Sequence, residues 1–173
     1  MFGHAGSPVG IAYRIAAVTR HRAPTFADFP TGAGVAAELA LVEASGLWEV
    51  LAWVLLPWRL EALVALHRGN LEDVAAGLLF RAALRVTRLR GRDGPVWDAR
   101  YAWRPVRGDG EIAATARALL RLPLRAHLTE HLADYPFWDS CWVCARPRVV
   151  AAPGGPAQRP MPEPALRQVD QNQ

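Results

Sequence analysis

The chain has 173 residues, 51% of them hydrophobic, and a formal net charge of +4 at pH 7. This length and composition suffice for one domain with a buried core and exclude a wholly disordered chain. All 20 basic residues are arginine, and a basic balance favours an acidic partner such as nucleic acid. The longest apolar run, Val50–Trp58, is far below the roughly 20 residues of a membrane span, and residues 1–10 lack a secretory signal. We therefore expect a cytoplasmic protein with no membrane partner. If the protein binds DNA, we expect it to be associated with the nucleoid.

Hydrophobic periodicity and turn residues divide the chain into strands and helices. Asn70 followed by two acids is typical of a helix N-terminus, and Gly46 and Pro123 are expected to end helices or kink them. In chain order the predicted elements are a strand at 9–19, a loop at 20–30, a helix at 34–45, strands at 47–56 and 59–66, a helix at 71–90, a turn at 91–95, a strand at 96–106, a helix at 109–122 and a short helical segment at 124–133.

This order predicts an α+β fold in which helices pack against one antiparallel sheet. Pro, Gly and Gln dominate from residue 146, so we predict a disordered tail at 146–173 after a single domain at 1–145. Because side chains alternate along a strand, the strand at 47–56 is expected to place four side chains on one face: Trp48, Val50, Ala52 and Val54.

Two local patterns contain residue types that can hold zinc. His127-Leu-Thr-Glu130-His131 matches the motif of inverted zinc proteases if it is helical, although two histidines at the solvent edge are the more ordinary interpretation. Cys141-Trp-Val-Cys144 has no second cysteine pair. These cysteines and both histidines could form a structural zinc site, but lone cysteines of this kind are more often packed as small hydrophobic residues. We expect no bound zinc.

Four stretches resemble the REP-associated tyrosine transposases, which are single-tyrosine transposases of insertion-sequence type with a His-hydrophobic-His motif. The stretch that closes the domain is the most specific of the four, and together they span about residues 9–143. The resemblance implies a ferredoxin-like, RRM-like α+β domain and a protein of DNA transposition. The four stretches are Ala12–Asp28, Leu51–Pro57, Arg92–Trp97, and Pro123–Ala126 followed by Asp134–Asp139.

In that family a tyrosine attacks a DNA phosphate, and a Mg or Mn ion held by the two histidines polarises the phosphate. By the resemblance, Arg59 and Glu61 stand at the two histidine positions after Pro57, and Ala118 stands at the tyrosine position. Leu122 stands where the family has the polar residue that completes the metal shell. All four have changed, so the resemblance implies an inactive enzyme that has lost its metal. Arg59 and Glu61 share one face of a strand and are expected to pair with each other.

DNA binding is expected to survive this loss. Residues 81–107 contain eight arginines and two aspartates, in a mixture of cations and aromatic rings that single strands favour. The alternative interpretation is purely structural: the arginines cover a helix face exposed to solvent, and the tryptophans belong to the hydrophobic core. The predicted nucleic-acid-binding residues are Arg81, Arg85, Arg88, Arg92, Trp97, Arg100, Tyr101, Trp103 and Arg104.

Three functions stay open at this point. The leading hypothesis is a catalytically inactive member of the transposase family that binds single-stranded or hairpin DNA. The first alternative is an inert or protein-binding relic of the same fold. The second is an active, metal-dependent DNA nickase or transposase with a relocated nucleophile. The remaining tyrosines, Tyr13, Tyr101 and Tyr135, match other positions of the family pattern and do not substitute for the missing one.

Overall fold

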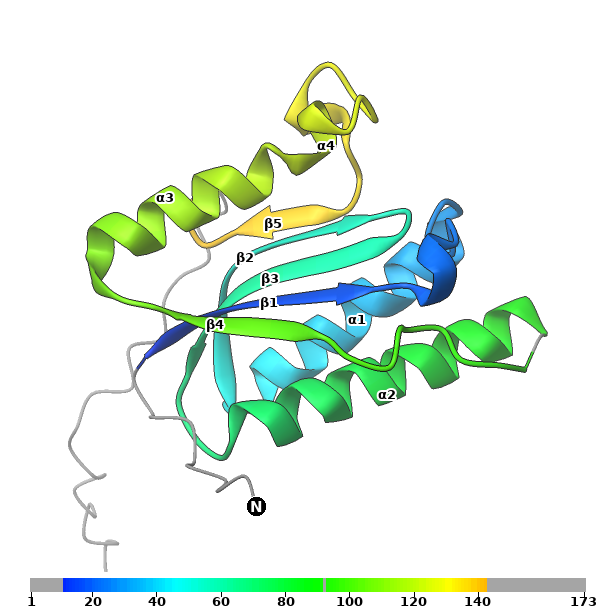
Figure 1. Cartoon of the computed structure of the whole chain (residues 1–173), viewed down its shortest axis with the longest axis horizontal. Helices are drawn as coiled ribbons and strands as arrows, with labels where there is room; N and C mark the ends of the chain where they lie inside the picture. The colour runs from blue at the N-terminus through cyan, green and yellow to red at the C-terminus, as the bar shows by residue number, and fades with distance from the viewer. Residues whose placement is uncertain (1–10, 92, 143–173) are drawn as a thin grey trace, which may run out of the picture.

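The computed structural model describes residues 11–91 and 93–142 (Figure 1). The predicted tail at 146–173 lies outside these residues, as do Arg92 and Cys144. No helix within the described part of the chain is long and apolar enough to cross a membrane. The elements are β1 (Ala12–Val18), η1 (Arg20–Arg22), α1 (Phe29–Ala44), β2 (Trp48–Leu56), β3 (Arg59–Leu66), α2 (Leu71–Arg90), β4 (Ala102–Val106), α3 (Gly108–Leu120), α4 (Leu122–Arg125), η2 (Leu132–Asp134) and β5 (Trp138–Ser140).

The strands form one antiparallel sheet in the order β4-β1-β3-β2-β5. The first six regular elements, β1-α1-β2-β3-α2-β4, have the connectivity of a ferredoxin-like domain. This confirms the predicted α+β fold. α3 then crosses the sheet, and β5 adds a fifth strand beside β2. Figure 1 shows α1 and α2 on one face of the sheet and α3 on the opposite face.

Each face of the sheet has its own hydrophobic core, because side chains alternate along the strands. In β3, Leu60 and Ala62 pack on the side of α1 and α2, whereas Leu63 packs on the side of α3. The α1–α2 side also buries Tyr13 from β1. The α3 side includes Leu119 from α3 itself. The sheet is therefore covered on both faces, and a charged group on the α3 face needs a partner.

A bulge in β2 changes which side chains share a face. The pairing of β2 with β3 shifts register between Val50 and Ala52. Trp48 and Val50 consequently pack in the core beneath α1 and α2, whereas Ala52 and Val54 pack in the core beneath α3. The prediction that these four side chains share one face is wrong, since one extra residue reverses the alternation.

Two helix predictions differ from the structure at their ends. α1 begins at Phe29, five residues earlier than predicted, because the side chain of Asp28 accepts a hydrogen bond from the amide of Thr31 at 2.9 Å. The predicted helix at 124–133 is wrong. α4 ends at Arg125, and His127 adopts a left-handed backbone with φ of 53°, which ends the helical path.

The predicted strand at 96–106 is shorter in the structure. β4 starts at Ala102, and Trp97 forms only an isolated bridge to Thr19. β5 was not predicted, since it has three residues. Asn70 caps α2 by accepting the amide of Glu72 at 3.0 Å, as predicted. Pro123 stands in the first turn of α4, just after α3 ends, which confirms its predicted role as a break.

Candidate functional site

Glu61 is the buried charge beneath α3. Its side chain is 0% exposed, and it lies in β3 between Ala16 of β1 and Val54 of β2. Arg14 of β1 donates from Nε to Oε2 of Glu61 at 2.8 Å and from a terminal nitrogen to Oε1 at 3.1 Å. Arg59 pairs with the same carboxylate from the same strand. The predicted pairing of Arg59 with Glu61 is confirmed, and Arg14 is a second partner that we did not predict.

We call Arg14, Arg59 and Glu61 the Glu61 triad. A carboxylate with no exposed surface is stable only when cations and hydrogen bonds replace its lost hydration. The two arginines supply both, and their side chains stay 32% and 35% exposed. The triad as a whole therefore carries one net positive charge at the surface. Within the described part of the chain, the Nε atom of Arg59 is buried and has no hydrogen-bond partner.

A second ion pair extends this charged surface to the edge of the sheet. Arg104 in β4 lies directly opposite Arg14 in the register of the two strands. Its guanidinium donates to Oε1 of Glu111 at 2.6 Å and to the hydroxyl of Thr115 at 3.4 Å. The amide of Arg107, and then the Arg104 guanidinium, lower the pKa of Glu111 below its usual value. Arg104 therefore joins β4 to the first turns of α3.

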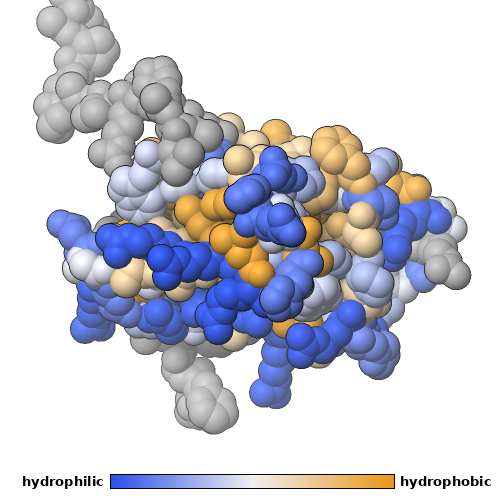
Figure 2. Space-filling model, turned by 90° about the horizontal axis from the view of Figure 1, so that it is seen from above, coloured by the Kyte–Doolittle hydropathy of each residue, from blue (hydrophilic) through white to orange (hydrophobic). Residues whose placement is uncertain are grey.

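The position that the resemblance assigns to the catalytic tyrosine lies on α3. Ala118 is exposed there, whereas Thr115, Ala116 and Leu119 form the buried side of the helix. Leu122 is half-buried and packs against the core beneath α3. Figure 2 views the molecule from the side of α3 and α4, where hydrophobic residues gather near the middle of the face and hydrophilic residues border them.

Two arginines of the predicted basic stripe hold α2 to α1. Arg81 and Arg85 both pair with Glu38 of α1, at 3.2 Å and 2.9 Å. The carboxylate of Glu38 is almost fully buried, while the two arginine side chains stay about half exposed. Arg88, further along α2, is exposed. The stripe exists as predicted, but two of its members also neutralise a buried acid.

Two of the predicted aromatic residues, Trp97 and Tyr101, contact α2 on a side of the helix other than that of the arginine stripe. Trp97 donates from Nε1 to the carbonyl of Leu79 at 2.9 Å, and the hydroxyl of Tyr101 donates to the carbonyl of Glu72 at 3.1 Å. Figure 1 shows the segment between α2 and β4 passing in front of α2, with α1 behind it. The structure therefore does not place these two aromatic rings next to the arginines that reach α1.

The exposed members of the predicted interface lie near the edge strand β4. Arg100 is exposed just before the strand. Trp103 is 40% exposed and packs edge-on against Tyr13, with ring centroids 5.8 Å apart. Arg104 is exposed as well, on the opposite face of the sheet. The structure brings these side chains to one edge of the sheet. Which of them bind nucleic acid stays a prediction.

The hydroxyl of Tyr135 is tied to the sheet. It donates to the carbonyl of Leu55 at 2.7 Å, and burial raises the pKa of Tyr135 to about 12 from the ordinary value of 10.0. Burial also raises the pKa of Tyr101, with further contributions from Glu72 and Asp73. Tyr13 is almost fully buried in the core beneath α1 and α2. The three tyrosines therefore have structural roles.

Replacing Tyr135 with phenylalanine is expected to lower the free energy of unfolding by about 1 kcal/mol, because the Leu55 carbonyl loses its partner. A raised folded pKa means that the tyrosine stabilises the fold below pH 10 and loses this contribution as the pH rises towards 12. Compared with the parent, the variant should lose one late step in the alkaline titration of tyrosinate absorbance. A variant that keeps this late step would contradict the assignment.

The zinc patterns are not assembled as their motifs require. His127 and His131 are exposed and lie outside any helix, so the helical His-x-x-Glu-His arrangement is absent from the described structure. Cys141 is half-buried against the core beneath α3, in line with packing as a hydrophobic residue. Cys144 lies outside the described residues.

The fold of this chain is similar to the folds of known transposases. No protein-family model and no curated protein sequence matches the chain. Among solved structures, it is similar to a REP-associated tyrosine transposase bound to a REP hairpin, with a TM-score of 0.62 and 15% identity over 80% of this chain and 81% of that chain. A predicted transposase from Deinococcus radiodurans R1 is similar with a TM-score of 0.49 and 17% identity, over 68% of this chain and 95% of that chain. The chain therefore has the fold of a REP-associated tyrosine transposase, the family that its sequence motifs resemble.

Proposed function

We propose that the chain is a catalytically inactive, DNA-binding relative of the REP-associated tyrosine transposases and that it binds single-stranded or hairpin DNA. The observation that carries the proposal is the Glu61 triad. By the resemblance, Arg59 and Glu61 stand at the two metal-ligand positions, and the structure closes the remaining carboxylate with two guanidinium groups. The fold is retained while the chemistry at its centre has been replaced.

The residues at this centre do not fit a divalent cation. Mg and Mn prefer oxygen or imidazole ligands with free electron pairs. Both oxygens of Glu61 already accept hydrogen bonds from Arg14, and Arg59 adds a second cation beside Oε1. A divalent ion there would have to displace both guanidinium groups and would be repelled by them. The arginines occupy the place of the metal, and they can attract phosphate without polarising it for cleavage.

A relocated nucleophile has little support from the remaining tyrosines. Nucleophilic attack needs the ionised phenol. The hydroxyls of Tyr101 and Tyr135 donate to backbone carbonyls, and both groups have a raised pKa. Tyr13 is buried beneath α1 and α2, on the face of the sheet opposite the Glu61 triad. The geometry supports binding without strand cleavage.

DNA binding is supported by the charge distribution and by the fold. A solved structure with this fold, a REP-associated tyrosine transposase, is bound to a REP hairpin, and we propose a related class of ligand for this chain. At the β4 edge, Arg100 and the partly exposed ring of Trp103 are accessible, and Arg104 adds an exposed cation on the opposite face of the sheet, where it pairs with Glu111. This combination contacts phosphates and stacks on unpaired bases. Arg88 on α2 adds an exposed cation that, unlike Arg81, forms no ion pair with an acid among the described residues.

Replacing Arg88 and Arg100 together with glutamine is expected to weaken hairpin-DNA binding several-fold at low salt. Each lost phosphate contact should also reduce the slope of log affinity against log salt by about 1. Fluorescence anisotropy with a labelled hairpin measures both quantities. Arg81 and Arg85 are poor targets for this test, because their removal also leaves Glu38 buried without its partners.

The matched control removes the same charge from the last turn of α3 and its C-cap, by Arg117→Gln with Arg121→Gln, and both arginines are exposed. The control should bind hairpin DNA more tightly than the test variant. Equal loss in the two double variants would show that binding follows net charge alone and not the predicted surface. No binding of the parent protein at low salt would favour the protein-binding relic.

A further inference from the structure

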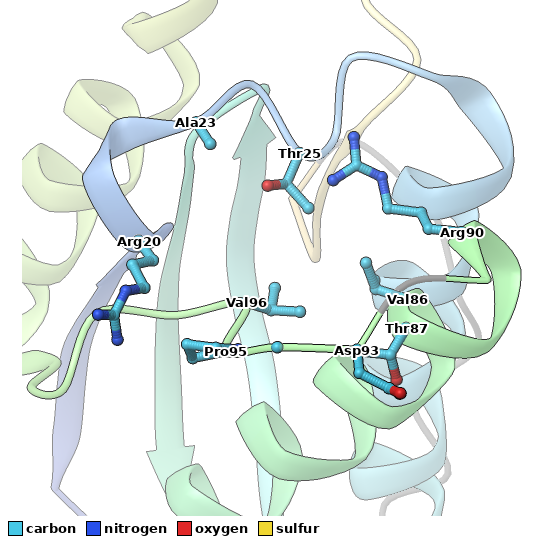
Figure 3. Close-up of a pocket in the computed structure, with 10 residues that line it drawn as sticks. Arg20, Ala23, Thr25, Val86, Thr87, Arg90, Asp93, Pro95 and Val96 are labelled. Carbon is cyan, nitrogen blue, oxygen red and sulfur yellow. The ribbon is translucent and has the colours of Figure 1, made fainter.

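A cavity of about 430 Å³ lies between the loop after β1, the end of α2 and the segment before β4 (Figure 3). This volume falls within the range of small-molecule sites, which is about 300–1,000 Å³. Val86 and Val96 form its buried apolar wall, and Pro95 extends that wall. None of the residues placed at the Glu61 triad lines this cavity. It is therefore separate from the centre described above.

Two cations stand on opposite sides of the cavity. Arg20 comes from η1 and Arg90 from the last turn of α2, and Figure 3 shows the cavity between them. Both side chains are exposed. The one acid that lines the cavity within the described residues is Asp93, so the lining has a net charge of +1. The carbonyl end of α2 opposes an anion, and Arg90 in the last turn offsets that effect.

Thr25 supplies a polar group that the fold itself does not use. The residue is 5% exposed and lines the cavity, and Figure 3 shows its side chain at one side of the cavity, between Ala23 and Arg90. Its backbone is fixed, since the carbonyl accepts the hydroxyl of Thr31 at 3.0 Å. Within the described part of the chain, the Thr25 hydroxyl makes no hydrogen bond. Thr25 therefore lines the cavity with a hydroxyl that a ligand can bind.

The loop that carries Arg20 is held in a strained conformation. His21 and Arg22 have φ of 55° and 53°, in the left-handed region that residues with a side chain seldom adopt. The amide of Arg20 donates to the carbonyl of Val96 at 2.9 Å, which joins the two sides of the cavity. Such strain persists where the surrounding structure enforces it and is frequent at ligand sites.

We propose that this cavity binds one unpaired nucleotide of single-stranded DNA. The base would lie against the wall of Val86, Pro95 and Val96 with the Thr25 hydroxyl at its edge, and Arg20 and Arg90 would contact the phosphates on either side. An apolar wall with a few polar groups suits a base, and two separated guanidinium groups suit a phosphodiester chain. This inference rests on the proposed function, because it assigns the unpaired part of the DNA to a site.

The test is a titration of the full chain with fluorescently labelled pentathymidylate. Thr25→Val keeps the shape of the side chain and deletes the hydroxyl, so affinity should fall about fivefold with an unchanged melting temperature. Arg20→Gln and Arg90→Gln should each weaken binding by about tenfold. Arg22→Gln is the matched control, since Arg22 is exposed in the same loop and does not line the cavity. The control should change affinity less than about twofold.

Competition separates a nucleotide site from a simple anion site. Thymidine 5′-monophosphate should displace pentathymidylate at much lower concentration than inorganic phosphate does. Equal competition by the two, or cavity variants that bind like the parent, or equal loss in Arg22→Gln, would overturn the inference. A parent that binds hairpin DNA but not pentathymidylate overturns it and leaves the proposed function standing. A parent that binds neither overturns both.

Discussion

Replacing Arg14 and Arg59 together with methionine is expected to lower the free energy of unfolding by about 3–5 kcal/mol. The double variant leaves the carboxylate of Glu61, which is 0% exposed, without either of its cations. Methionine keeps the length of the aliphatic stem, so loss of packing contributes little. Urea denaturation of parent and variant measures the difference.

Adding Glu61→Leu to this double variant should recover most of the lost stability, since a well-packed apolar group can replace a buried ion pair at little cost. The control is Arg117→Met with Arg121→Met, which removes two exposed arginines and should change stability by no more than about 0.5 kcal/mol. A triple variant as unstable as the double variant would show that the arginines matter for packing and not for neutralising Glu61.

Incubation of the protein with hairpin DNA and manganese is expected to give no covalent protein–DNA product. By the resemblance, the nucleophile position is Ala118, which has no hydroxyl and is exposed on α3. By the same resemblance, the metal position falls at the Glu61 triad, whose carboxylate is already paired with two arginines. Because residues that act as one catalytic unit fail together, Ala118→Tyr alone should also form no product. The measurement is a denaturing gel of labelled DNA.

The informative outcome of that gel is a shifted band. A band formed by the parent protein and mapped by peptide analysis to Tyr13, Tyr101 or Tyr135 would establish a relocated active site. Such a band would contradict the structural roles assigned to these hydroxyls. A band that appears with Ala118→Tyr alone would show that the Glu61 triad still admits a metal.

The regular part of the fold could be predicted from local sequence signals. The strand at 59–66 and the helix at 71–90 have the predicted bounds, because the break at Pro57 and Trp58, the apolar run that follows it, the Asn70 cap and Gly91 mark them. The bulge in β2 could not be predicted, since its register depends on pairing with β3. β5 was not predicted, because a strand of three residues shows no periodicity and its partner, β2, is more than 80 positions away in the chain.

The candidate site divides in the same way. The pairing of Arg59 with Glu61 follows from their spacing on one strand. Arg14 is 47 positions from Glu61, and only the order of the strands brings the two together. The sequence does contain one signal for it, since Arg14 is the sole charged residue in the apolar strand β1. The cavity lined by Arg20, Thr25 and Arg90 could not be predicted from the sequence, because three separate segments form it.

Binding of a labelled hairpin against a duplex of matched length tests the central claim most directly. The account predicts that the parent protein binds the hairpin more tightly than the duplex at about 50 mM salt, with affinity that falls steeply towards about 200 mM as phosphate contacts are screened. The same samples should contain only intact DNA. Failure to bind the hairpin at low salt, or equal affinity for hairpin and duplex, would contradict the account.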